Sequence, residues 1–424
     1  MIENDKTGRA LGPQEALFAE LTRRGNGGIQ LVTIARFEEA PKAGDVIRAL
    51  KRIHQRHPMM RARIEDRDTL WWVCDVPFEE IEIRLEPIDE NFDLEIFYAR
   101  EAARVIDVAA VSWRATLVTD DQDRVVWIAL VSNHAGIDGR SALVVLNDLD
   151  TILTAPEDWS GEPLPLTAPA EVGLAEAGYS GDRALLPVWP AETMWQVETP
   201  AASDQRKPHG FLRVVPRETI DAVHERLRAE DIHLASAFVA AAVEAARELP
   251  GRTDWTGIVA PTDVRADCAP PIAGNAVGEY VAGINLLVGN DLQETGLVEI
   301  ARELQNQFTR NRPPSLQMDA GVPLPETVRQ VDQMAAACDV FAGGICVTDV
   351  GDLNRLSGRR VGFSEVLMMP SQNHGIHPVL VAVVSTNAGT CLSFGFDEPL
   401  QTHANAAAFA DRYIAALEAL AGGV

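Results

Sequence analysis

The sequence VVWIALVSNHAGIDG occupies residues 125–139 and indicates more about fold and function than any other stretch of the chain. Its first seven residues are apolar, which is typical of a buried strand, and a helix is expected to begin near Ser141. The turn between them combines His134, Asp138 and Gly139. Because catalytic groups are often displayed on turns of this kind, the stretch predicts a functional site as well as a strand-turn-helix unit.

His134 is the candidate general base of this turn. A neutral imidazole can take a proton from a hydroxyl or amine as that group attacks a carbonyl. Asp138 could hold the ring, pair with an arginine or share a metal with His134, and the spacing does not choose among these roles. The glycines allow sharp bending or close approach to a ligand, where N–H groups can face a developing oxyanion. The alternative is an ordinary turn with a capping aspartate, since Asn, His, Asp and Gly are all common turn residues.

Composition favours a two-domain protein that binds small molecules. A chain of 424 residues is expected to fold as two domains of about 200 residues each. The chain has 46% apolar residues, no apolar run long enough for a bilayer and no signal peptide, so we expect a cytoplasmic protein without a membrane span. The net charge of -25 argues against nucleic acid or anionic membrane as partners.

The sequence predicts no metal site. A zinc site needs at least three protein ligands, and neither HExxH nor a Cys/His pair supplies them. The cysteines are scattered and odd in number, so we expect reduced core residues rather than disulfides. They are Cys74, Cys268, Cys338, Cys346 and Cys391.

A proline-rich segment from Ala155 to about Pro216 is expected to separate two lobes. We predict an N-terminal lobe over 1–175, a crossover linker over 176–215 and a C-terminal lobe over 216–424. The mixed order of helices and strands predicts α/β (α+β) lobes with largely antiparallel pairing.

The two lobes contain a similar series of elements. Residues 114–139 are expected to form strand, turn, strand and the His-Asp-Gly loop, and residues 379–400 show the same order without a histidine. The second lobe is therefore interpreted as a copy of the first that lacks the base.

Several fragments resemble the condensation-domain and CoA-dependent acyltransferase superfamily, whose motif is HHxxxDG. The segments LGPQE at 11–15 and LKRIHQRHPMMRAR at 50–63 are similar to its opening elements. The segment PTDVR at 261–265 is similar to its PxxxR element, and VTDVG at 347–351 is similar to its SNxG strand end. In size the chain is most similar to free-standing polyketide-associated acyltransferases of the phthiocerol dimycocerosyl transferase type. The resemblance implies two chloramphenicol-acetyltransferase-like lobes that form a V around a central tunnel.

The resemblance also implies roles for individual residues. His134 matches the base, Asp138 matches a structural aspartate, and Arg265 is the expected partner of Asp138. Thr348 and the backbone around Gly139 are candidate oxyanion donors. No cofactor is expected to stay bound. The donor substrate would be a phosphopantetheine thioester on a carrier protein or an acyl-CoA. The acceptor would be an alcohol or an amine.

Two positions depart from the family pattern. Asn133 replaces the first histidine of HHxxxDG, and Asp349 replaces the asparagine of SNxG. Asn133 is expected to support the loop by a hydrogen bond. The alternative function is a degenerate scaffold that binds a carrier protein or partner enzyme without chemistry.

Two further groups of residues have open roles. An acidic carrier protein would need a local basic patch, for which three arginine clusters are candidates: Arg23-Arg24, Arg310/Arg312 and Arg359-Arg360. His374 and His377 could form a metal site or a second catalytic site, or belong to a loop that lines or closes the tunnel or lies on the surface.

Overall fold

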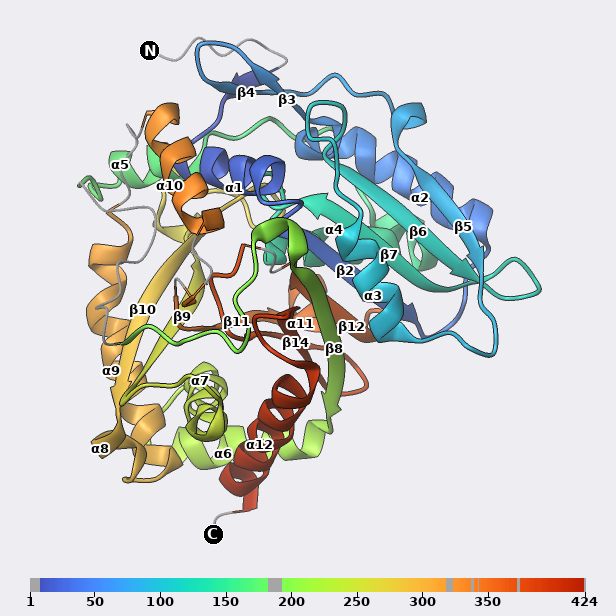
Figure 1. The fold of residues 1–424 in the computed structure, drawn as a ribbon. Helices are drawn as coiled ribbons and strands as arrows, with labels where there is room; N and C mark the ends of the chain where they lie inside the picture. The colour runs from blue at the N-terminus through green and yellow to red at the C-terminus, as the bar shows by residue number, and fades with distance from the viewer. Residues whose placement is uncertain are drawn as a thin grey trace.

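The computed structural model describes residues 8–181, 193–317, 323–336, 339–341, 343–371 and 374–422. They form two large sheets and one small sheet (Figure 1). The five-stranded sheet consists, in spatial order, of β12 (Phe363–Pro370), β2 (Gln30–Phe37), β7 (Val125–Asn133), β6 (Trp113–Thr119) and β5 (Ile83–Pro87). The six-stranded sheet consists of β10 (Val281–Gly289), β9 (Trp255–Asp263), β11 (Ile345–Asp352), β13 (Leu380–Ser385), β14 (Thr390–Glu398) and β8 (Lys207–Val215). The small sheet consists of β1 (Gly8–Ala10), β4 (Leu70–Val73) and β3 (Arg63–Asp66).

The principal helices are divided between the two halves of the chain. The N-terminal half supplies α1 (Pro13–Arg24), α2 (Ala43–Arg56), α3 (Leu94–Ala103), α4 (Gly139–Thr154) and α5 (Ala170–Glu176). The C-terminal half supplies α6 (Arg217–Ala229), α7 (Leu234–Ala245), α9 (Leu297–Ser315), α10 (Leu324–Ala336) and α12 (His403–Gly422), with the short α8 (Asn290–Gln293) and α11 (Leu353–Ser357).

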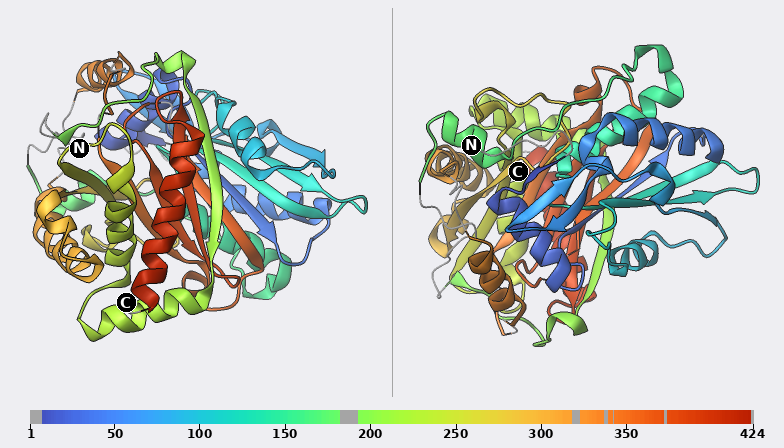
Figure 2. Two further views of the ribbon diagram at one scale, coloured as in Figure 1. Left: turned by 60° about the horizontal axis from the view of Figure 1, so that its bottom comes forward. Right: turned by 90° about the horizontal axis from the view of Figure 1, so that it is seen from above.

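In each half, helices bury an apolar face on a large sheet. The α2 helix turns Val46, Leu50 and Ile53 inward, at the spacing of one helical face, and these side chains are fully buried beside α4 and the five-stranded sheet. The α12 helix lies along the six-stranded sheet (Figure 2), with α6 and α7 beside it. Two apolar cores result, which agrees with the two-lobe fold expected from the sequence.

Two strands depart from the division expected at the 176–215 linker. Strand β8 lies within that segment yet pairs with β14, Phe211 opposite Phe394, at the edge of the six-stranded sheet. An edge strand tolerates proline, and Gly210 lets the strand approach Tyr98, whose ring carbon would lie 2.8 Å from an added Cβ. These residues resemble a linker in sequence although they form a strand. Strand β12 pairs with β2, so the C-terminal half supplies an edge strand to the N-terminal sheet.

The strand pairing and the state of the cysteines can also be compared with the sequence expectations. Pairing is mostly antiparallel, with parallel contacts at β5–β6, β11–β13 and β11–β9. The α7 helix ends at Ala245 and continues as a short 3-10 turn. Four cysteines are buried free thiols; Cys338 lies outside the described residues. No described helix has the length and apolarity that a membrane crossing requires.

Candidate active site

The turn after β7 is fixed by Asp138, which is the N-cap of α4. The Asp138 carboxylate accepts a hydrogen bond from the Ser141 backbone N–H at 2.6 Å. An aspartate at this position satisfies a backbone donor that the helix itself leaves without an acceptor. The capping role considered from the sequence is therefore present, and the remaining contacts of Asp138 add to it.

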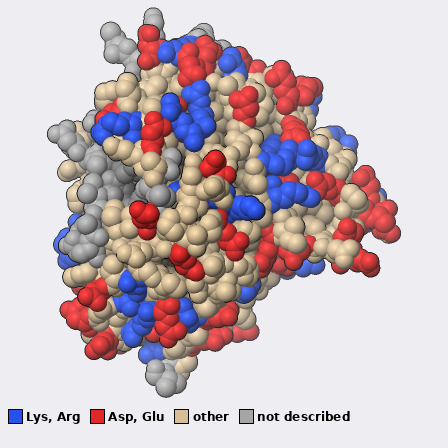
Figure 3. Space-filling model, viewed as in Figure 1, with Lys and Arg blue, Asp and Glu red and all other residues tan. Residues whose placement is uncertain are grey.

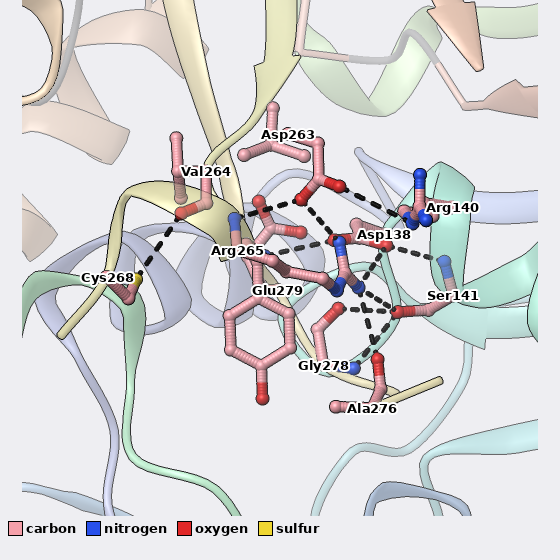
Figure 4. Close-up of polar contacts among 12 residues, drawn as sticks. Asp138, Arg140, Ser141, Asp263, Val264, Arg265, Cys268, Ala276, Gly278 and Glu279 are labelled. Carbon is pink, nitrogen blue, oxygen red and sulfur yellow. Dashed lines mark hydrogen bonds and ion pairs between the residues drawn. The ribbon is translucent and has the colours of Figure 1, made fainter. Parts of the chain in front are cut away.

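Asp138 is also paired with Arg265, which reaches it from the turn after β9 (Figure 4). The guanidinium Nη1 lies 3.0 Å from Asp138 Oδ2, and Nη2 donates to Oδ1 at 3.1 Å. Arg265 is only 2% exposed and Asp138 0%. The arginine is thus a buried partner from the other half of the chain, as the motif resemblance implied, rather than a surface residue. Burial raises the pKa of Asp138, but the charge and hydrogen bonds of Arg265 outweigh it and hold the pKa below its ordinary value.

The segment before β10 completes this junction. The Asp138 N–H donates to the Gly278 carbonyl, and the Tyr280 N–H donates to the Asp138 carboxylate at 3.0 Å. The Ser141 hydroxyl both donates to the Gly278 carbonyl and accepts from the Gly278 N–H. The Arg265 guanidinium also lies over the Tyr280 ring, 4.5 Å from its centroid. This network fixes the motif turn against the segment that carries Glu279.

Glu279 holds the candidate base. The Nδ1 atom of His134 lies 3.1 Å from Glu279 Oε2, and the ring packs edge-on against Phe18 at 5.1 Å between centroids. The other carboxylate oxygen of Glu279 accepts from the Gln14 amide at 3.0 Å. When Glu279 is ionised its carboxylate only accepts, so Nδ1 carries the proton and the neutral ring has its lone pair on Nε2. The geometry therefore sets the tautomer that a general base requires.

The two groups change each other's pKa. Burial raises the pKa of Glu279 to about 7, opposed by its hydrogen bond to His134. Burial lowers the pKa of His134, but the hydrogen bond and charge of Glu279 outweigh it, so the pKa lies above its ordinary value of 6.5. The pair therefore binds or releases a proton near neutral pH, where a general base is most effective.

His134 and Glu279 line a cavity between the two sheets. Residues of α1, β2, β12 and the motif turn line one side, and residues of β9, β10, β11 and β13 line the other. The volume is about 190 Å³, enough for an organic group, since a cavity of about 150 Å³ can hold benzene. The His134 side chain is 15% exposed, so it is accessible from this space.

The other predicted site residues fall into two groups. Gly139 and Thr348 line the cavity, and a Cβ on Gly139 would lie 3.1 Å from Val350 of β11. Asn133 is fully buried and does not line it; its side-chain oxygen accepts from the Ala135 N–H at 3.1 Å. Asn133 thus supports the turn, and Gly139 allows α4 to begin close to the opposite sheet. Among the described residues no cluster of three or more potential metal ligands is present.

Sequence reasoning missed Glu279, which is 145 positions from His134. Its only local signal is an acidic residue at the start of the otherwise apolar stretch that becomes β10. Nothing in that pattern indicates which residue the acid contacts.

Comparison with known proteins supports the fold and not a sequence family. A scan against protein-family models finds no match, and neither does a search of curated proteins. Among solved structures, trichothecene 15-O-acetyltransferase from Fusarium sporotrichioides is 13% identical with a TM-score of 0.70, covering 97% of this chain and 95% of that chain. The condensation domain of the monacolin K polyketide synthase is 12% identical with a TM-score of 0.69, covering 98% and 97%. Polyketide synthase associated protein 5 from Mycobacterium tuberculosis is 14% identical with a TM-score of 0.66, covering 97% of each chain. The chain has the fold of condensation domains and related acyltransferases, as its motifs predicted.

Proposed function

We propose that this protein is an acyltransferase that moves an acyl group from a thioester to an alcohol or amine. The observation that carries the proposal is the His134–Glu279 pair, which directs a histidine with a free Nε2 lone pair at a cavity between two lobes. The names of the similar structures, condensation domains and an acetyltransferase, describe acyl-transfer chemistry in those proteins and support the same class here. The donor would be a carrier-protein phosphopantetheine or CoA.

His134 would move one proton. As the acceptor oxygen or nitrogen attacks the thioester carbonyl, its proton passes to Nε2 and a C–O or C–N bond forms. The C–S bond then breaks, and Nε2 returns the proton to the leaving thiolate. The negative carboxylate of Glu279 stabilises the imidazolium that exists between these steps. A positioned base of this kind contributes about 10² to 10⁴-fold.

Two groups are candidates for stabilising the developing oxyanion. The Gly139 N–H belongs to the first turn of α4, where backbone donors have no acceptor within the helix and the helix dipole favours negative charge. Thr348 lines the same cavity from β11, on the opposite side. Both would act only as charge develops on the carbonyl oxygen.

The arginine clusters considered for carrier docking are all paired with acids. Arg23 and Arg24 share Glu20, Arg310 and Arg312 pair with Glu303 and Asp267, and Arg359 and Arg360 pair with Asp150 and Glu38. Figure 3 shows the resulting mixture of positive and negative side chains on one face. None of these clusters therefore offers an unopposed positive charge, and free CoA thioesters should be tested beside carrier-bound ones.

The test measures thiol release and product formation from acyl-CoA and acyl-pantetheine donors with a panel of alcohols and amines. We expect acceptor-dependent thiol release by the wild type and a loss of about 10² to 10⁴-fold in His134→Ala. His224→Ala, on the exposed side of α6, is the matched control and should leave the rate unchanged. Equal, slow release by wild type and His134→Ala, with retained binding of a carrier protein, would instead support the scaffold alternative.

A further inference from the structure

Two more histidines line the same cavity. His374 and His377 lie in the segment between β12 and β13, with ring centroids 6.0 Å apart and ring planes at 89°. His374 is only 3% exposed. Neither ring takes part in the proton transfer proposed for His134.

Backbone contacts fix opposite tautomers in the two rings. His377 Nδ1 lies 2.6 Å from the Gly344 carbonyl oxygen; because a carbonyl only accepts, this nitrogen carries the proton and Nε2 carries the lone pair. His374 Nδ1 instead accepts from the Ile376 N–H at 2.9 Å, so its proton is on Nε2. No described residue makes a hydrogen bond to either Nε2. The pair therefore offers one free acceptor and one free donor.

Both rings stay uncharged near neutral pH. Burial lowers the pKa of His377 to about 4, and burial together with the neighbouring charges lowers that of His374 well below its ordinary value. The donor and the acceptor are thus fixed rather than exchanged by protonation.

The pair lies toward the end of the cavity away from Gly139. A Cβ on Gly343 would lie 3.5 Å from His377, whereas Val350, further along the same chain segment, contacts the position of Gly139. The six residue-to-residue steps from Gly344 to Val350 extend over about 20 Å at the rise of a strand. A substrate chain that occupies the whole cavity would therefore bring a distant part of itself to the histidines.

The rest of the lining is suited to an uncharged ligand. Its other polar side chains include Gln14, Glu279, Asn285 and Thr348, and no Lys or Arg lines it among the described residues. A carboxylate or phosphate would lose its hydration without a compensating cation and would meet Glu279. A hydroxyl group, which both donates and accepts, matches the paired Nε2 atoms without any charge.

We propose that His374 and His377 recognise a hydroxyl group on an otherwise apolar substrate chain, and so determine specificity. The proposal rests on the proposed acyl transfer and narrows its substrate class to chains that are hydroxylated at a distance from the reacting carbonyl. His377 Nε2 accepts a hydrogen bond from the hydroxyl O–H, and His374 Nε2–H donates a hydrogen bond to the hydroxyl oxygen.

The test measures binding of unreactive amides by calorimetry: octanamide, decanamide and dodecanamide, each with and without a terminal hydroxyl, and with a terminal carboxylate. We expect at least one ω-hydroxy amide to bind about fivefold more tightly than its plain counterpart, the effect of about one net hydrogen bond, and the carboxylates to bind more weakly. In His374→Asn and His377→Asn, the asparagine amide can replace the Nδ1 contact to the backbone while Nε2 is lost. Both variants should bind the plain amides as wild type does and lose the hydroxyl preference; His224→Asn should keep it.

Three results would overturn the proposal: no hydroxyl preference in wild type, the same preference in both asparagine variants, or no binding of any chain. The proposed acyl transfer is judged separately by thiol release in wild type and His134→Ala. A hydroxyl preference without thiol release would reject the enzyme and keep the recognition site.

Discussion

Two hairpins occupy corresponding places in the two large sheets. In the five-stranded sheet, β6 and β7 are followed by α4; in the six-stranded sheet, β13 and β14 are followed by α12. The first strand of each hairpin has a parallel neighbour, β5 or β11, and the second has an antiparallel neighbour, β2 or β8. This shared topology agrees with the interpretation of the second lobe as a copy of the first. Only the first copy places a histidine between the hairpin and its helix.

The two copies treat a buried aspartate differently. Asp138 is paired with Arg265 and accepts backbone hydrogen bonds, and its pKa is lowered. Asp397, at the end of β14, is 2% exposed, and neither of its carboxyl oxygens has a hydrogen-bond partner among the described residues. Burial raises the pKa of Asp397 well above its ordinary value, more than the charge of Arg206 lowers it. The difference is that groups from the C-terminal half of the chain, Arg265 and the Tyr280 N–H, complete the contacts of Asp138, which the hairpin alone does not provide.

The largest expected effect comes from removing the charge of each aspartate. Asp138→Asn leaves Arg265 buried with only the partly exposed Asp263 as a charged partner, so we expect the free energy of unfolding to fall by about 3 kcal/mol. Asp397→Asn should change it by less than about 1 kcal/mol, because no described residue donates a hydrogen bond to that carboxyl and its raised pKa favours the neutral form. Urea unfolding of both variants measures the contrast.

The pH dependence of the unfolding free energy should also differ between the two aspartates. The pKa of Asp138 in the folded protein lies below its ordinary value of 3.8, so its contribution to stability is present above that pH and is lost as the pH falls further. Equal destabilisation by the two substitutions would contradict the assignment of opposite charge states.

A smaller effect is expected at the start of the two helices. The α4 helix begins with Gly139 against Val350 and Met368, whereas α12 begins with His403, whose side chain is 50% exposed. Gly139→Ala places a methyl group 3.1 Å from Val350, and we expect a loss of about 1 kcal/mol in unfolding free energy and a higher KM, because the cavity narrows.

The matched control for this substitution is Gly44→Ala, near the start of α2, where an added Cβ meets only the flexible end of Arg48. It should stabilise the protein by up to about 1 kcal/mol, since alanine favours the helix. If Gly139→Ala were stabilising as well, the inference that Gly139 is needed for the close approach of α4 to β11 would be wrong.

The smallest expected effect is at Asn133. Asn133→Ala removes the acceptor of the Ala135 N–H and should lower the unfolding free energy by about 1 kcal/mol, while acyl transfer is retained. The same assays measure it. A loss of activity as large as that of His134→Ala would show that Asn133 takes part in the chemistry. It would refute the assignment of Asn133 to support of the turn and of His134 to catalysis.

The sequence predicts what local pattern determines and misses what distant contacts determine. The strand, turn and helix around His134 follow from apolar residues, glycine and a capping aspartate within one short stretch. The Asp138–Arg265 pair is predictable only through the resemblance to PxxxR. Glu279 contacts His134 across the lobes without a local signal, and β12 and β8 join their sheets through pairings that no short pattern specifies.

The most direct test of the account is an NMR titration of the His134 ring in protein with labelled histidine. Wild type is compared with Glu279→Gln, and His134→Ala identifies the signal of His134. We predict that neutral His134 carries its proton on Nδ1 and has a pKa above 6.5, because burial is outweighed by Glu279. In Glu279→Gln the pKa should fall by about 1 to 3 units, and the acidic limb of kcat/KM should move to lower pH with it. A neutral ring protonated on Nε2, or a pKa that does not change in Glu279→Gln, would contradict the assignment of His134 as a base held by Glu279.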